Sequence, residues 1–112
     1  MSAPINQITL SGWVARNPVC VSKQRYSFQL VQHPHQVKFH EALSTFDRCL
    51  VATVTSADSW IDEVIKQGDH VVVSGRVVPS ESGSEDVLRS APLCIWAASI
   101  QRSEFVEQLR YI

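Results

Sequence analysis

The chain has 112 residues, of which 45% are hydrophobic and 19% are charged, and its formal net charge is −1. This length allows one domain with its own core, and the composition is that of a globular protein rather than a disordered one. No stretch has the roughly 20 apolar residues of a membrane-spanning helix, and residues 1–4 lack the layout of a secretion signal. We therefore expect a cytoplasmic protein with a single domain over residues 1–112.

The charge is distributed unevenly along the chain. Residues 1–40 contain four basic residues and no acidic one, whereas residues 41–112 contain six basic and eleven acidic residues. This asymmetry favours a basic binding surface built from the first part of the chain, although chance clustering of so few basic residues would give the same pattern.

A first strand is predicted over residues 8–15, because apolar and polar residues alternate there. Gly12 interrupts the apolar face, which indicates a bulge or a close approach of another backbone. A turn at Asn17-Pro18 separates this strand from a second one that ends near Gln32. The apolar face of the second strand consists of Tyr26, Phe28 and Leu30. We expect the two strands to form a hairpin with a long basic connection.

The middle of the chain predicts an arm, a strand and a helix. Residues 33–41 lack periodicity and contain a proline, so they predict a long exposed arm. The β-branched residues between Phe46 and Thr55 predict a third strand. A short helix follows, with Ser59 as its N-cap and Gly68 as its left-handed end. Its apolar stripe consists of Ile61, Val64 and Ile65.

The last part of the chain predicts two further strands. The fourth runs from His70 to Val78, with a bulge at Gly75. An exposed acidic loop is expected over residues 79–86, and a fifth strand over residues 93–100. Residues 103–112 predict a short helical extension after a domain core of residues 5–102.

Three strands, one helix and two strands is the order of the OB-fold, a partly open Greek-key barrel whose exposed face and loops bind oligonucleotides. We therefore predict an all-β fold, a five-stranded OB-fold barrel with one short helix between strands 3 and 4. An open edge near residues 8–14 favours pairing of the first strand with a second copy across a two-fold axis.

The sequence also resembles the bacterial single-stranded DNA-binding proteins over residues 5–102. The similar blocks, in the same order, are residues 10–18, 28–30, 51–54, 64–77 and 97–100. Three features depart from the family pattern: Arg48 stands where its third strand has a base-stacking tryptophan, residues 109–112 are not its acidic tail, and the loop between the fourth and fifth strands is acidic. Recruitment of partners through such a tail is therefore not expected.

The resemblance implies sequence-tolerant binding of single-stranded DNA in replication, repair or plasmid maintenance, by a homodimer or homotetramer. Primosomal replication protein N, which has the same fold, is the alternative relative and implies replication or primosome proteins as partners. That relative carries lysines where residues 79–86 are acidic. A protein-interaction subunit that binds no nucleic acid is the alternative from another class.

Binding a single strand requires cations for phosphates and flat side chains for stacking. The candidate nucleic-acid-binding residues are Trp13, Arg16, Lys23, Arg25, Lys38, Phe39, Phe46, Arg48 and Arg76. Trp13 shares the polar side of its strand with Ser11, where either a stacking residue or a residue covering the barrel end would lie. Lys38 and Phe39 belong to the predicted arm, where an exposed aromatic residue beside a cation suits clamping a DNA strand. The alternative is that they have no role in binding.

The faces of the later strands decide which other aromatic residues are available. Phe46 and Arg48 share a face that we expect to meet the ligand, because arginine is seldom buried without a partner. The opposite face, expected in the core, consists of Cys49, Val51 and Thr53. Trp60 and Trp96 are also predicted in the core. Trp60 precedes Val64 by four residues, which places both on one face of a helix. Trp96 precedes Ile100 by four residues, which places both on one face of a regular strand.

Nothing in the sequence indicates catalysis, a metal or a cofactor. His33, His35 and His40 lack a cysteine or carboxylate cluster that would complete a metal site, so solvated loop histidines are expected. The sequence has no glycine-rich phosphate loop and no nucleophile elbow. Cys20, Cys49 and Cys94 are widely separated, which favours reduced, mostly buried thiols.

Overall fold

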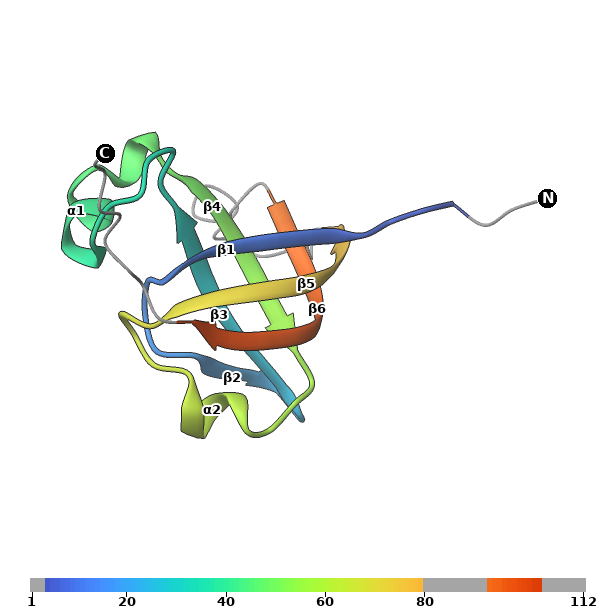
Figure 1. The fold of residues 1–112 in the computed structure, drawn as a ribbon. Coiled ribbons are helices and arrows are strands. Elements are labelled where there is room, and N and C mark those ends of the chain that lie inside the picture. Colours follow the sequence, from blue (N-terminus) through green and yellow to red (C-terminus); the bar gives the residue numbers. More distant parts are fainter. Residues whose placement is uncertain (1–3, 80–92, 104–112) are drawn as a thin grey trace.

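The computed structural model describes residues 4–79 and 93–103 (Figure 1). In chain order its elements are β1 (Ile8–Val14), β2 (Val19–Ser22), β3 (Arg25–Gln32), α1 (Phe39–Ser44), the 3₁₀ turn η1 (Phe46–Arg48), β4 (Leu50–Ser56), α2 (Ile61–Val64), β5 (His70–Val78) and β6 (Leu93–Ser103). Most of the predicted acidic loop and of the helical extension lies outside the described residues.

Five of the strands close into a barrel. The hydrogen-bonded order is β1-β5-β6-β4-β3-β2, and β1 closes the ring by pairing also with β3, at Trp13 and Val14. The β4–β6 pair is parallel, and the other pairs are antiparallel. Because α2 lies between β4 and β5, the third and fourth strands of the barrel, the predicted five-stranded OB-fold is confirmed.

The prediction missed β2. Within the described chain, β2 pairs only with β3, in a hairpin whose turn holds Gln24 at a φ of 61°. All four residues of β2 are exposed, so the alternation that marks a half-buried strand is absent there. The connection expected between the first two strands therefore contains an extra strand at the end of the sheet.

The inner faces of the strands fill the barrel, and α2 closes one end of it. The predicted apolar face of β3 is confirmed, since Phe28 and Leu30 are buried in this core and Tyr26 packs against it. Side chains of this size contribute about 1.5–3 kcal/mol each when fully buried. The fully buried members of the core are Val14, Leu30, Ala52, Val54, Ile61, Ile65, Val71, Val73 and Ile95.

Two glycines lie where a neighbouring backbone leaves no room for a side chain. A Cβ at Gly12 would come within 2.5 Å of the Val31 carbonyl oxygen, and one at Gly75 would overlap the Trp96 carbonyl oxygen. The β5–β6 register shifts at Gly75, and Ala98 has no partner in the described ladder. The close approach predicted at Gly12 is confirmed, and the irregularity predicted at Gly75 is confirmed as a register shift whose extra residue, Ala98, lies on the partner strand β6.

The predicted arm over residues 33–41 is wrong in its second part, because the chain enters α1 at Phe39. The apolar residues of α1 span little more than one turn, which is too short for a helical period to be recognised. This helix packs outside the barrel in a second apolar cluster. The buried members of that cluster are Trp13, Ala15, Val31 and Ala42, with Val37, Phe39, Leu43, Cys49 and Val51 packed against them.

The face predicted for the third strand is wrong. β4 begins at Leu50 instead of Phe46, and its buried side chains are Ala52, Val54 and Ser56. Val51 lies on the opposite side and is apolar because it packs in the outer cluster near α1. Both faces of β4 are therefore partly apolar, and the alternation of residues alone does not show which face points into the barrel.

The helix α2 also differs from the prediction. The residue that precedes its first turn is Trp60 rather than Ser59, and no side chain caps it. Ile61 is buried as predicted, but Trp60 and Val64 are 38% and 40% exposed. The core position predicted for Trp60 is wrong because the shared face of Trp60 and Val64 is the solvent face. Gly68 has a φ of 89°, as expected for a left-handed position.

Candidate nucleic-acid interface

The outer face of the sheet carries a row of polar and aromatic side chains. Ser27 pairs with Thr55, Thr55 with Trp96, and Trp96 with Arg76, which places one residue from each of β3, β4, β6 and β5 side by side. Their chain neighbours Phe28, Val54 and Ile95 are buried in the barrel. Since side chains alternate along a strand, the row points outward.

Trp96 is half-buried and points out of the barrel, so its predicted core position is wrong. The prediction assumes that Trp96 and Ile100, which are four residues apart, lie on the same face of the strand. The β5–β6 register shifts at Ala98, so residues before and after it with the same spacing lie on opposite faces. The inward residues are Ile95 and Ala97 before the bulge and Ile100 after it. The glycine at position 75 predicts an irregularity in the ladder, but nothing in the sequence indicates that the extra residue lies on the partner strand β6.

Arg25 lies over the indole of Trp96, with its guanidinium carbon 5.4 Å from the ring centroid. A cation over an aromatic face at this distance is attracted by the ring electrons. The same indole borders a groove of about 550 Å³ between the start of β1 and the bulge. The groove is lined by Asn6, Gln7, Ile8, Thr9, Ser74, Gly75, Arg76, Trp96 and Ala98.

A second group of candidates lies at the start of β4. Phe46 is 41% exposed in η1, and Arg48 in the same turn is exposed. Lys38 precedes α1 and is exposed, whereas Phe39 is half-buried, with its ring centroid 5.9 Å from that of Trp13. Phe46 and Arg48 therefore offer more free surface to a ligand than Phe39 does.

Trp13 is 8% exposed and belongs to the outer cluster. Its indole N–H donates to the Val37 carbonyl oxygen at 3.2 Å, and the His70 ring meets it edge-on at 4.8 Å. This position leaves little of the ring for stacking.

The candidate cations are all on the surface, although they do not form one cluster. Arg16 and Lys23 flank β2, Arg25 begins β3, and Arg76 lies on β5. Lys38 and Arg48 lie near α1 and η1. The exposed candidates are Arg16, Lys23, Arg25, Lys38, Arg48 and Arg76.

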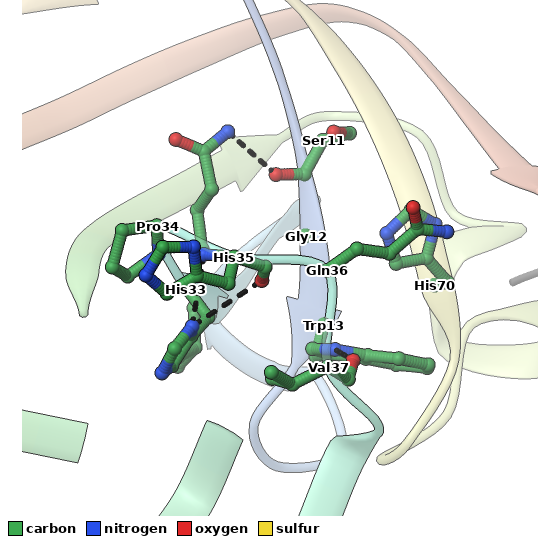
Figure 2. Close-up of a pocket in the computed structure, with 11 residues that line it drawn as sticks. Ser11, Gly12, Trp13, His33, Pro34, His35, Gln36, Val37 and His70 are labelled. Atoms are coloured by element: carbon green, nitrogen blue, oxygen red, sulfur yellow. Dashed lines mark hydrogen bonds between the residues drawn. The ribbon is translucent and has the colours of Figure 1, made fainter. Parts of the chain in front are cut away.

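A polar pocket of about 440 Å³ lies between β1 and the loop that precedes α1 (Figure 2). Figure 2 shows His33, Pro34 and His35 on one side, His70 on the other, and Trp13 with Val37 below. The lining contains no lysine or arginine among the described residues. Burial lowers the pKa of His70, which favours its neutral form. The pocket thus offers hydrogen-bonding groups and no lysine or arginine, which suits the edge of a base better than a phosphate.

The cysteines and histidines of the described residues form neither a disulfide nor a metal-ligating cluster. Cys20 is exposed, Cys49 and Cys94 are half-buried, and none of the three forms a disulfide, so the expectation of mostly buried thiols is wrong. Burial, followed by the charge of Asp47, raises the pKa of the Cys49 thiol. Residues 4–79 and 93–103 contain no group of three metal-ligating side chains, and none of their helices is long and apolar enough to cross a membrane.

The closed barrel, the parallel β4–β6 pair and the helix between its third and fourth strands define an OB-fold. No protein-family model matches the chain, and no curated protein matches it in sequence.

Solved structures do match. The small single-stranded DNA-binding protein of Streptomyces coelicolor is similar at a TM-score of 0.60 and 20% identity, over 91% of this chain and 96% of that one. The second single-stranded DNA-binding protein of Mycobacterium smegmatis gives 0.61 and 18%, over 92% and 98%. A mitochondrial single-stranded DNA-binding protein of S. cerevisiae gives 0.62 and 10%, over 94% and 100%. At these identities the similarity shows a shared fold over nearly the whole chain.

Proposed function

We propose that the chain binds single-stranded DNA with little regard to sequence and catalyses no reaction. The observation that carries the proposal is the outward position of Trp96 beside Arg25 and Arg76. An indole supplies a stacking surface and guanidinium groups supply phosphate contacts, which are the two requirements for sequence-tolerant binding. The three solved structures named above are described as single-stranded DNA-binding proteins, which supports the proposal.

The strand would cross the outer face of β4 at Thr53 and Thr55. It would continue toward Phe46 past Val51, which packs in the outer cluster near α1. Phe46 lies just before β4, and Trp96 lies beside Thr55 near its end. The 7 residues of β4 span about 20 Å at about 3.3 Å per residue, so the two aromatic residues mark the ends of a path several nucleotides long. The remaining side chains on or beside this path are Arg25, Ser27, Gln29, Arg48, Thr53 and Arg76.

We place this activity in the cytoplasm, in DNA replication, repair or plasmid maintenance, with a primosomal accessory role as the alternative. A homodimer or homotetramer is part of the proposal. β1 pairs with β5 over Ile8–Trp13 but with β3 only at Trp13 and Val14, so the second edge of residues 8–12 has no ladder partner in the described chain. A monomer mass in light scattering at micromolar concentration would remove the oligomer from the proposal.

Titration of a labelled oligo-dT, followed by fluorescence anisotropy, tests the binding. Each phosphate contact on a single strand contributes about −0.7 to the slope of log K against log salt. Arg48→Gln and Arg76→Gln should therefore each flatten the slope by about 0.7, whereas Lys66→Gln, near α2, should not. A folded protein that does not bind oligo-dT at low salt would refute the proposal.

A protein-interaction subunit without nucleic-acid binding is the second candidate function. The exposed indole of Trp60 favours it, because tryptophan is enriched at the energetic centres of protein interfaces. Under this alternative the anisotropy of oligo-dT stays constant at every protein concentration.

A further inference from the structure

The solvent face of α2 carries an apolar pair that the barrel does not use. Trp60 and Val64 are 38% and 40% exposed, and they are neighbours one turn apart, since the Val64 N–H donates to the Trp60 carbonyl oxygen at 3.0 Å. On the opposite side, Ile61 and Ile65 are fully buried. The α2 segment thus closes the barrel with other residues, and the exposed indole is not needed to fill the core.

The surroundings of this pair are acidic. Asp58, Asp62 and Glu63 are all exposed. The nearby cation Lys66 donates from Nζ to the Asp62 carbonyl oxygen at 2.8 Å. Carboxylates repel phosphates, so this indole is poorly placed to stack on a nucleic acid. An exposed apolar pair with an acidic rim suits a partner that presents apolar side chains between cations.

The β2 hairpin of the same protein has this complementary composition. Val19 and Val21 are 57% and 56% exposed, which is high for side chains in a strand. Exposed cations flank them, Arg16 before β2 and Lys23 in the turn after it, and residues 1–40 contain no acidic residue to offset them. β2 ends the sheet order, so a second molecule can approach it.

We propose that neighbouring copies on one DNA strand touch each other through the β2 hairpin of one copy and the outer face of α2 of the next. The inference rests on the proposed DNA binding. Like charges oppose a β2–β2 or an α2–α2 contact, whereas β2 against α2 brings opposite charges together. In one copy β2 and α2 lie beside each other, since the Gln67 N–H after α2 donates to the Asn17 Oδ1 before β2 at 2.7 Å, so two neighbouring copies can make the contact reciprocally (Figure 1). Trp96 lies three strands from β2 in the sheet order, about 14 Å away at about 4.8 Å per strand, and Arg25, which pairs with Ser22 at the end of β2, lies over its ring.

The contact is weak between free molecules. Four partly exposed side chains cover much less than the roughly 800 Å² per partner of a standard interface. A DNA strand holds its bound copies close together, and the resulting effective concentration brings a weak contact into use. The contact therefore acts as cooperativity on long strands rather than as a stable dimer in solution.

The test compares labelled oligo-dT of one-site length with poly-dT that holds many sites. The wild-type protein should bind each site of the long strand at least tenfold more tightly than the short one. Glu63→Lys and Lys23→Glu should each lower this ratio at least fivefold. A mixture of the two variants should restore part of it, because Lys23 of one variant then meets Glu63 of the other.

Two further variants separate packing from charge. Trp60→Ala should lower the ratio and leave the affinity for the short oligonucleotide unchanged. Ile5→Ala, which removes an apolar side chain that is 89% exposed elsewhere, should change neither. Circular dichroism identifies any variant that does not fold, and Glu63→Gln then replaces Glu63→Lys with a smaller effect in the same direction.

The outcomes distinguish this inference from the proposed function. A wild-type ratio near one, or a ratio that the variants leave unchanged, overturns the contact while binding to the short oligonucleotide stands. A ratio lowered in both variants but not restored in the mixture also overturns it and assigns the losses to DNA contacts. Failure of the wild-type protein to bind the short oligonucleotide refutes the proposed function itself.

Discussion

Replacing Trp96 by alanine tests where the bases stack. Stacking on an aromatic side chain contributes about 1–3 kcal/mol per base, so the dissociation constant for oligo-dT should rise about 5-fold to 150-fold. The loss should not depend on salt, because an indole makes no ionic contact with phosphate. Anisotropy titrations at several salt concentrations measure both quantities, with unfolding curves to show that the variant is folded.

The control for this experiment is Trp60→Ala, which removes an equally large ring from the acidic face of α2 and should leave the affinity for a short oligonucleotide unchanged. Phe46→Ala, at the other end of β4, should behave like the Trp96 variant. The reasoning is refuted if Trp96→Ala, in a folded protein, changes the dissociation constant by less than twofold. Stacking would then have to be assigned to the η1 end of β4 alone.

Three further predictions concern stability and reactivity. Burial lowers the pKa of His70, so the unfolded chain binds a proton at this histidine more readily than the folded one. The contribution of His70 to stability should therefore be full above about pH 6.5 and be lost as the pH falls toward the lower pKa of the folded state. Urea unfolding at several pH values should show this loss, and a His70→Gln variant with the same pH dependence would contradict it. The exposed thiol of Cys20 should react with a thiol reagent before that of Cys49, whose pKa is raised; faster modification of Cys49, detected by peptide mapping, would contradict the burial. Gly75→Ala should destabilise the fold by about 1–3 kcal/mol, since the Trp96 backbone occupies the space of the new methyl group; an unchanged melting temperature would argue against the bulge.

The barrel could be predicted because most of its strands bury one face and expose the other. In β3, Phe28 and Leu30 alternate with half-buried polar residues, and the period of two is plain. In β5, Val71 and Val73 are buried, and Gly75 marks the irregularity correctly. The positions of exposed cations such as Arg76 were also predictable, because arginine is seldom fully buried.

The aromatic residues of the site were harder to place, for reasons that differ from residue to residue. α1 covers the outer side of β1, so Trp13 is buried on a face that its polar neighbour Ser11 marked as exposed. The same cover makes Val51 apolar on the outer side of β4. On α2, Trp60 shares a face with Val64 as the spacing required, but periodicity identifies only which residues share a face. Which face meets the barrel is decided by Ile61 and Ile65, through tertiary packing.

The bulge at Ala98 links the fold to the proposed interface. With strict alternation, an inward Ile100 would require an inward Trp96, and the barrel is already filled by side chains such as Ile95 and Val54. One extra residue in β6 changes the parity, so the strand directs apolar side chains inward on both sides of the bulge while the indole points outward. Gly75 permits this because its missing side chain lets the Trp96 carbonyl approach β5. The local irregularity in β6 thus places the Trp96 indole on the outer face, beside Arg25 and Arg76.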